Sequence, residues 1–230
     1  AAFVSALQNP TRGPATLAMA GTYSVTITVG GCTSAVGTVN VVVNPTPATP
    51  TASSNSPVCA GSPLNLSTPA VAGATYSWTG PNSFSSALQN PTIGAPTVAA
   101  SGTYSVTVTV GGCTSAFGTT TVVVNPIPAT PTPGSNSPVC TGSTITLTTT
   151  AVAGATYSWT GPAAFASALQ NPTRPGATLA MAGTYSLTIT VNGCTSGIGT
   201  VTVVVNATPA APTAGSNSPI CAGSTLNLTA

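Results

Sequence analysis

The feature that most constrains the fold of this chain is an 81-residue internal repeat. Four sets of residues recur with this spacing: Cys32, Cys113 and Cys194; Cys59, Cys140 and Cys221; Tyr23, Tyr104 and Tyr185; and Trp78 and Trp159. A fixed period without insertions is typical of small modules that follow one another along the chain.

The period divides the sequence into two complete modules, residues 45–125 and 126–206, and two partial ones. Residues 1–44 match the C-terminal part of a module, and residues 207–230 match the N-terminal part of a further module. We expect these residues to be a stretch of a longer array. The alternative is a protomer that completes its end modules with strands from neighbouring copies.

Each module reads as a series of short β-strands. In the stretch Ser101–Cys113, apolar Tyr104, Val106, Val108 and Val110 alternate with hydroxyl side chains, which predicts a strand with one buried face. A glycine pair and a second β-rich run follow, as in a hairpin. With turn signals every 8–12 residues and no helical periodicity, the pattern predicts an all-β fold of antiparallel β-sandwiches, about seven strands per 81-residue module. Closely spaced prolines at 45, 47 and 50 predict a short, stiff linker between modules.

The charge content excludes several classes of function. The chain has two arginines and no Lys, Asp, Glu or His. Proton transfer, nucleophilic catalysis and metal binding need side chains that are missing, so we expect no enzyme activity, no cofactor and no metal site. Two positive charges give no basis for nucleic-acid binding. No apolar run reaches the length of a membrane helix. Glycans on Ser and Thr, burial in a regular assembly, or hydration of hydroxyl groups must therefore keep the chain dispersed or ordered.

Two stretches carry a resemblance to immunoglobulin-like (Ig-like) domains. Ala100–Val106 resembles their tyrosine-corner strand, and Trp78, twelve residues after Leu66, resembles their core tryptophan. The runs SNSPVCAGS, YSWTGPNSF, LQNPTI and SGTYSVTVTVGGCTS are similar to Ig-like or PKD-like repeats of large secreted and cell-surface proteins of Bacteroidota-type bacteria. The resemblance implies an extracellular or cell-surface location, in adhesins, stalks or matrix, with no fixed ligand.

The modular cysteines predict disulfides in an oxidising compartment, with free buried thiols as the alternative. In the topology that the resemblance implies, Cys59 and Cys113 lie at opposite ends of one module. A bond within a module then exceeds the reach of a disulfide. We therefore predict that Cys59 pairs with Cys194 and staples each module to its successor. The runner-up pairs Cys59 with Cys113 and Cys140 with Cys194. Cys32 and Cys221 belong to the same framework.

Few other residues are candidates for a site. We expect Trp78 and Trp159 to be core residues rather than sugar platforms, and Tyr23, Tyr104 and Tyr185 to be corner residues. The N-glycosylation pattern occurs at Asn65, Asn206 and Asn227. Arg12 and Arg174 share a repeat position with Ile93, which favours a tolerant loop surface.

Three functions fit this pattern. The first is a non-catalytic structural array that forms an extracellular stalk or filament, glycosylated on Ser and Thr. Its partners would be copies of itself along or across a fibre. The second is a cell-surface adhesin that presents a distal domain or binds glycans through its loops. The third is a binding module with its site in residues 81–96.

The lack of side-chain carboxylates and imidazoles predicts that the free energy of unfolding hardly changes from about pH 3 to pH 8, because almost no group titrates differently in the folded and unfolded states there. Denaturant unfolding followed by tryptophan fluorescence should give the same midpoint across this range. A steep acid transition would contradict the prediction.

Overall fold

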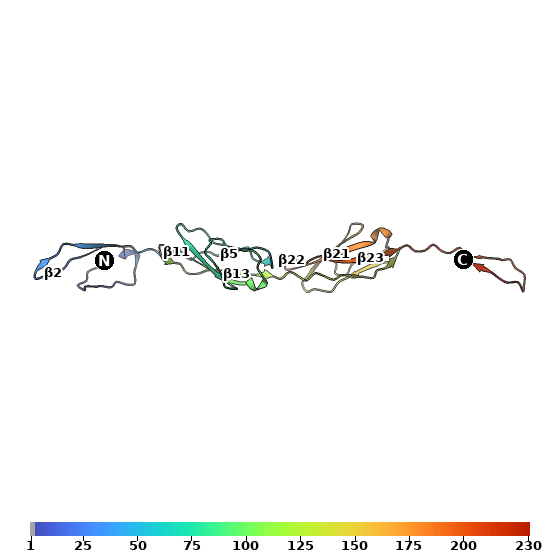
Figure 1. Ribbon diagram of the computed structural model, residues 1–230, viewed down its shortest axis with the longest axis horizontal. Helices are drawn as coiled ribbons and strands as arrows, with labels where there is room; N and C mark the ends of the chain where they lie inside the picture. The colour runs from blue at the N-terminus through green and yellow to red at the C-terminus, as the bar shows by residue number, and fades with distance from the viewer. Residues whose placement is uncertain (1–2) are drawn as a thin grey trace. The chain divides into compact units, whose positions relative to one another are not determined.

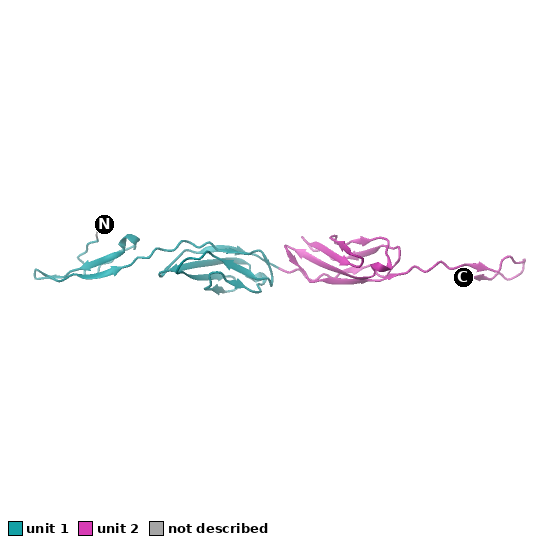
Figure 2. Ribbon diagram, turned by 90° about the horizontal axis from the view of Figure 1, so that it is seen from above, with its two compact units in different colours: residues 1–125 teal, residues 126–230 magenta. Residues whose placement is uncertain are grey.

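In a computed structural model, which describes residues 3–230, the chain forms two compact units, residues 1–125 and 126–230 (Figure 2). Both units are built from β-strands, and three single-turn 3-10 helices precede long hairpins: η1 (Leu17–Met19), η2 (Val98–Ala100) and η3 (Leu179–Met181). The elements recur with the 81-residue period of the sequence, so that one description serves both units.

The strands of residues 45–125 are β5 (Ser53–Ser54), β6 (Val58–Cys59), β7 (Leu64–Ser67), β8 (Thr75–Gly80), β9 (Phe84–Ser86), β10 (Thr92–Ile93), β11 (Gly102–Val110), β12 (Cys113–Thr114), β13 (Gly118–Val122) and β14 (Val124–Asn125). Their counterparts one repeat later are β15 (Gly134–Ser135), β16 (Val139–Cys140), β17 (Ile145–Thr148), β18 (Thr156–Gly161), β19 (Phe165–Ser167), β20 (Thr173–Arg174), β21 (Gly183–Val191), β22 (Cys194–Thr195), β23 (Gly199–Val203) and β24 (Val205–Asn206).

Two sheets make up the sandwich of residues 45–125. One sheet has the order β5-β7-β10, and the other has the order β9-β8-β11-β13, with β12 extending the hairpin of β11. Strands β5, β11 and β13 are labelled in Figure 1. After β5, strand β6 runs parallel to β14, which follows β13 along the chain, in a separate two-stranded sheet. All other pairs in the module are antiparallel. The first strand is divided, because β5 pairs with β7 and β6 pairs with β14. With β5 and β6 counted as one strand, and β12, β13 and β14 as another, the module has seven strand positions. This is the Ig-like topology that the sequence predicts, and the predicted fold class is confirmed.

The alternation in β11 sets the two faces of its sheet. Tyr104, Val106 and Val108 are fully buried, and Val106 lies directly opposite Trp78 on β8. The facing sheet contributes Leu64 and Leu66 to the same core. In the second unit the core contains the counterparts Ile145, Leu147, Trp159, Tyr185 and Leu187.

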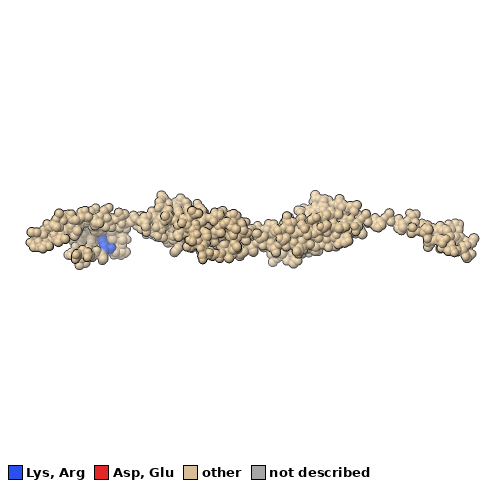
Figure 3. Space-filling model, in the orientation of Figure 1, with Lys and Arg blue, Asp and Glu red and all other residues tan. Residues whose placement is uncertain are grey.

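The opposite face of the same sheet is a field of hydroxyl groups. Register brings Ser105 opposite Thr79 and Thr119, and Thr107 opposite Ser77. Thr109 and Thr114 place their Oγ1 atoms 2.9 Å apart. Hydrogen bonding by Ser and Thr therefore replaces charge on this surface, and Figure 3 shows almost no charged side chain on the face in view.

Residues 3–44 repeat only part of this plan. They contain β1 (Gly21–Val25), β2 (Thr28–Val29), β3 (Cys32–Thr33) and β4 (Gly37–Val41), with β1 pairing β4 and β2 pairing β3. Residues 207–230 contain one small hairpin, β25 (Gly215–Ser216) with β26 (Leu228–Thr229). The core strands β7 and β8 have no counterpart one repeat earlier in the sequence.

The hairpin between β18 and β19 generates a stability prediction. Ala163 and Ala164 have φ of 52° and 53°, a left-handed conformation that costs an L-residue about 1–2 kcal/mol and a glycine almost nothing. Ala164→Gly should therefore raise the free energy of unfolding of the second unit by roughly 1 kcal/mol. Calorimetry of the whole chain measures this change as a higher transition temperature.

The matched control is Ala166→Gly on strand β19, where φ is not positive. The same chemical change should there lower the stability by about 0.5–1 kcal/mol. An equal effect of both substitutions would contradict the interpretation.

Candidate functional site at the junction between modules

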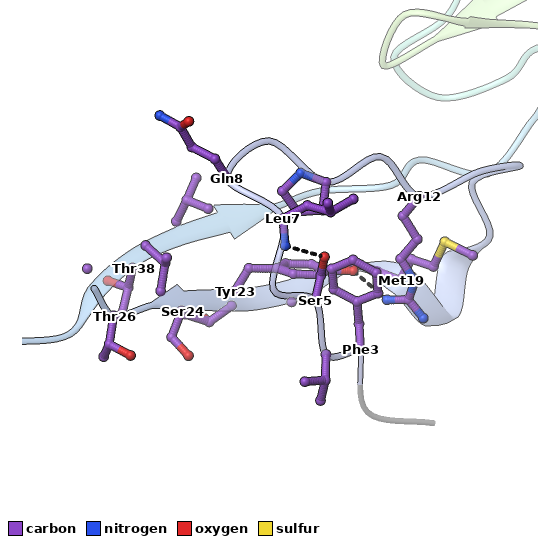
Figure 4. A pocket seen from close by; sticks show the side chains of 18 of the residues that line it. Phe3, Ser5, Leu7, Gln8, Arg12, Met19, Tyr23, Ser24, Thr26 and Thr38 are labelled. Atoms are coloured by element: carbon purple, nitrogen blue, oxygen red, sulfur yellow. Dashed lines mark hydrogen bonds between the residues drawn. The ribbon is translucent and has the colours of Figure 1, made fainter. Parts of the chain in front are cut away.

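A hollow along residues 3–43 is lined by Phe3, Leu7, Arg12, Met19 and Tyr23, among others (Figure 4). One repeat later, the counterparts Phe84, Ile93, Ala100 and Tyr104 belong to a closed core, whereas Leu88, the counterpart of Leu7, is 66% exposed. Val25 and Ile27 are 65% and 66% exposed, whereas their counterparts Val106 and Val108 are 0% exposed. In residues 45–125, Val106 packs in one core with Leu64 and Leu66 of the facing strand β7 and with Trp78 of β8, the neighbour of β11 in the same sheet. We therefore interpret the hollow as an uncovered core face, and not as a ligand site.

The aromatic residues singled out from the sequence lie inside the sandwiches. Trp78 and Trp159 are 0% and 1% exposed, and their Nε1 atoms donate to the carbonyl oxygens of Gln89 and Gln170. The Tyr104 hydroxyl donates to the carbonyl of Ala100 at 3.0 Å, as in a tyrosine corner. Burial raises the pKa of this hydroxyl above its ordinary value, because desolvation disfavours the charged phenolate. Tyr185 and Tyr23 make the same bond to Met181 and Met19.

The interpretation of the repeat position of Arg12 and Arg174 as a loop surface is wrong for Arg174. Arg174 lies on β20, its Nη1 atom donates to the Tyr185 hydroxyl at 2.7 Å, and its Cζ atom is 4.8 Å from the Phe165 ring centroid. Arg12 makes the same bond to Tyr23. At the same position Ile93 packs against the core. The long apolar stem of arginine lets it replace isoleucine at the edge of the sandwich while the tyrosine hydroxyl accepts from its head group.

The loop of residues 81–96 uses its polar groups internally. Gln89 donates through Nε2 to the carbonyl of Thr68 at 2.8 Å, and Asn90 accepts from the Thr68 amide at 3.1 Å. These bonds tie the loop to the segment that follows strand β7, whereas Asn82 and Ser83, between β8 and β9, are exposed.

A contact between modules occurs inside the first unit. Asn44, in the segment after β4, donates from Nδ2 to the carbonyl of Gly111 at 2.8 Å. The Cys113 sulfur lies 3.6 Å from the Asn44 carbonyl oxygen. Gly111 and Gly112 form the tight turn between β11 and β12 with positive φ. The end of one module thus meets the hairpin turn of the next at a cysteine.

The counterpart of Asn44 one repeat later is Asn125, and this residue is the direct partner of Cys59 in the parallel pair β6–β14. The amide of Ala60, next to Cys59, donates to the Asn125 carbonyl at 2.8 Å. Two cysteine positions of the repeat therefore adjoin the same asparagine position. One belongs to the module that the asparagine ends, and the other belongs to the module that follows.

Within a module the two cysteine positions are far apart. Cys113 pairs with Val110 at one end of the nine-residue strand β11, whereas Val122, shortly before Asn125, pairs with Gly102 at the other end. The strand spans about 27 Å, and a disulfide requires Cα atoms within about 7 Å.

The oxidation states of the cysteines differ. Cys59 and Cys194 are disulfide-bonded. Cys32, Cys113, Cys140 and Cys221 carry free thiols, so the predicted role of these four as disulfide cysteines is not fulfilled here. The runner-up pairs, Cys59 with Cys113 and Cys140 with Cys194, are contradicted, because both require a cysteine that is free and both bridge opposite ends of a sandwich.

The three asparagines of the glycosylation pattern are exposed. Asn65 accepts through Oδ1 from the Thr92 hydroxyl at 2.9 Å. Asn206 pairs with Cys140 at a strand end, and Asn227 lies just before β26. Attachment of glycans at these positions stays a prediction.

Over residues 3–230, no group of three or more Cys, His, Asp or Glu side chains is positioned to hold a metal. No helix in this range is long and apolar enough to cross a membrane. The role of Asn44 and Asn125 was not predicted from the sequence. The signal was the recurring VVVN that ends each module, at Asn44, Asn125 and Asn206.

No protein-family model matches this chain, and no curated protein matches it. Solved structures with a similar course of the chain include murine CEACAM1b, with 12% identity over 69% of this chain and 100% of that chain and a TM-score of 0.43. Drosophila OTK extracellular domains 3–5 share 14% identity over 83% and 72%, with a TM-score of 0.41. The three N-terminal domains of the bacteriophage RB49 outer capsid protein Hoc share 17% over 68% and 59%, with a TM-score of 0.37. We assign the fold from the strand order and draw no function from these likenesses.

Proposed function

We propose that this chain is structural material of an extracellular stalk or filament, in which a disulfide between Cys59 and Cys194 staples one module to its successor. The observation that carries the proposal is the junction inside the first unit, where Asn44 contacts the hairpin turn of the next module beside Cys113. Because Cys59 lies opposite the counterpart asparagine, the repeat brings both cysteine types to one junction.

The states of the six cysteines agree with this pairing. The first cysteine of each module would bond to the second cysteine of the module that follows. Only Cys59 and Cys194 occupy these two positions in successive modules of the printed sequence, and both are in the disulfide form. Forming the bond joins the two sulfurs, releases two protons and transfers two electrons to a disulfide oxidant, which an extracellular or periplasmic compartment supplies.

The chemistry of the described surface supports a structural role. Hydroxyl faces, two arginines engaged with tyrosines, and internally bonded loops leave few groups for catalysis or for a specific ligand. In this proposal Ser and Thr on the outer sheet faces carry glycans, which supply the hydration that charge provides elsewhere. An origin in Bacteroidota-type bacteria, which the resemblance to their surface repeats implies, remains a prediction.

Mass spectrometry of secreted, non-reduced material tests the staple. Proteolysis should yield a cross-linked peptide pair that contains Cys59 and Cys194 and separates on reduction. A linked pair of Cys59 with Cys113 would overturn the pairing. The intact mass of the same material tests the glycans, because a mass equal to that of the bare chain excludes them.

Negative-stain microscopy of secreted material tests the role. Long fibres of uniform width are expected for a structural array. Single flexible strands tethered to cells would instead support the adhesin, and retention of the chain on a glycan array would support a binding module.

A further inference from the structure

We infer that the disulfides give the array a second covalent path, which carries tension around the β-sandwiches instead of through them. The inference rests on the proposed bond between Cys59 and Cys194. It assigns these bonds a mechanical function: an array that does not lengthen when its modules unfold.

The spacing of the cysteines defines the path. Equal 27-residue segments run from Cys32 to Cys59 and from Cys194 to Cys221. A bond between Cys59 and Cys194 joins these two segments and removes residues 60–193 from the line of tension. The segment from Cys113 to Cys140 has the same length and belongs to a second, interleaved line. The sandwiches then connect the two lines without carrying their tension.

The segment from Cys32 to Cys59 has little slack. It consists of the end of the β2–β3 hairpin, strand β4, a proline-rich stretch without turns, and strands β5 and β6. Prolines 45, 47 and 50 hold the middle of the segment in extended conformations. A chain of this length reaches at most about 90–97 Å, and an extended segment is already close to that limit. An applied force is therefore borne by the covalent backbone and the disulfide after only a small lengthening of the segment.

The linker is also docked on the sandwich that it enters. A Cβ atom at Gly118 on β13 would overlap the backbone carbonyl of Pro50, and at Gly199 it would overlap that of Pro131. Glycine at these positions lets the linker backbone lie directly against the last strand. The linker is thereby held against the sandwich at this point, which limits the slack of the segment.

The non-covalent resistance along the ordinary path is small. Strands β6 and β14, where the chain enters and leaves a module, share only a two-residue parallel pair. The amides of Val58 and Ala60 donate to the carbonyls of Val123 and Asn125 at 3.1 and 2.8 Å. Without the disulfide, pulling the ends apart would shear this short pair and then unfold the module.

Single-molecule force spectroscopy of the whole chain, held at its two ends, tests the inference. Unfolding of an 81-residue module releases roughly 250 Å of chain. The oxidised chain should show no step of this size. The double variant Cys59→Ser with Cys194→Ser should show two such steps, and so should the original chain in dithiothreitol. These steps also establish that the modules of the variant are folded. The matched control, Cys113→Ser with Cys140→Ser, alters two free thiols and should behave as the original chain does.

Peptide mapping of the same oxidised sample separates the two levels of the argument. If the Cys59–Cys194 peptide is present and the oxidised chain still lengthens in steps of roughly 250 Å, the mechanical inference is wrong while the pairing stands. If the peptide is absent, the pairing and the inference both fall.

Discussion

The burial of one tryptophan and one tyrosine between two small sheets is the interaction on which each sandwich depends. Trp78 lies opposite Val106, and Tyr104 closes the corner through its bond to Ala100. Residues 3–44 contain the same hairpin and the same tyrosine corner, but no strand within that described range covers them, and Val25 is accordingly 65% exposed. Residues 3–44 thus keep the pairing of the hairpin, whereas the core of residues 45–125 also contains side chains of β7 and β8.

A fold without acidic side chains must take its specificity from shape and neutral hydrogen bonds. The corner tyrosine, the indole bond to Gln89 and the backbone bonds of Thr68 each satisfy a polar group at the edge of the core. Buried neutral bonds keep their strength when pH or salt changes, because neither partner is charged. The outer faces likewise use neutral hydrogen bonds in place of ion pairs. On one of them the hydroxyl groups of Thr109 and Thr114 are hydrogen-bonded to each other.

The faces of the strands could be predicted from the sequence, because alternation is local: the buried face of β11 follows directly from Tyr104, Val106 and Val108. The tyrosine corner and the core tryptophan followed from resemblance. Arg174 could not be placed, because its partners Phe165 and Tyr185 approach it only after the sheets pack. The change of pairing partner along the first strand, where β5 pairs with β7 and β6 pairs with β14, could not be predicted either. Strands of two residues are too short to show a periodic pattern. The role of Asn44 depends on the next module's turn, 67 residues away.

The gapless 81-residue period acquires a physical reason at the junction. A disulfide tolerates Cα separations of only about 4.4–6.8 Å, and one inserted residue displaces an extended chain by about 3.3 Å. Loops that merely connect strands tolerate insertions, whereas a linker whose length sets the distance between two cysteines does not. The docking of Pro50 on Gly118 and the bond from Asn44 to Gly111 impose the same restriction from both sides of the junction. The proposed disulfide between successive modules would thus fix the length of the linker between them.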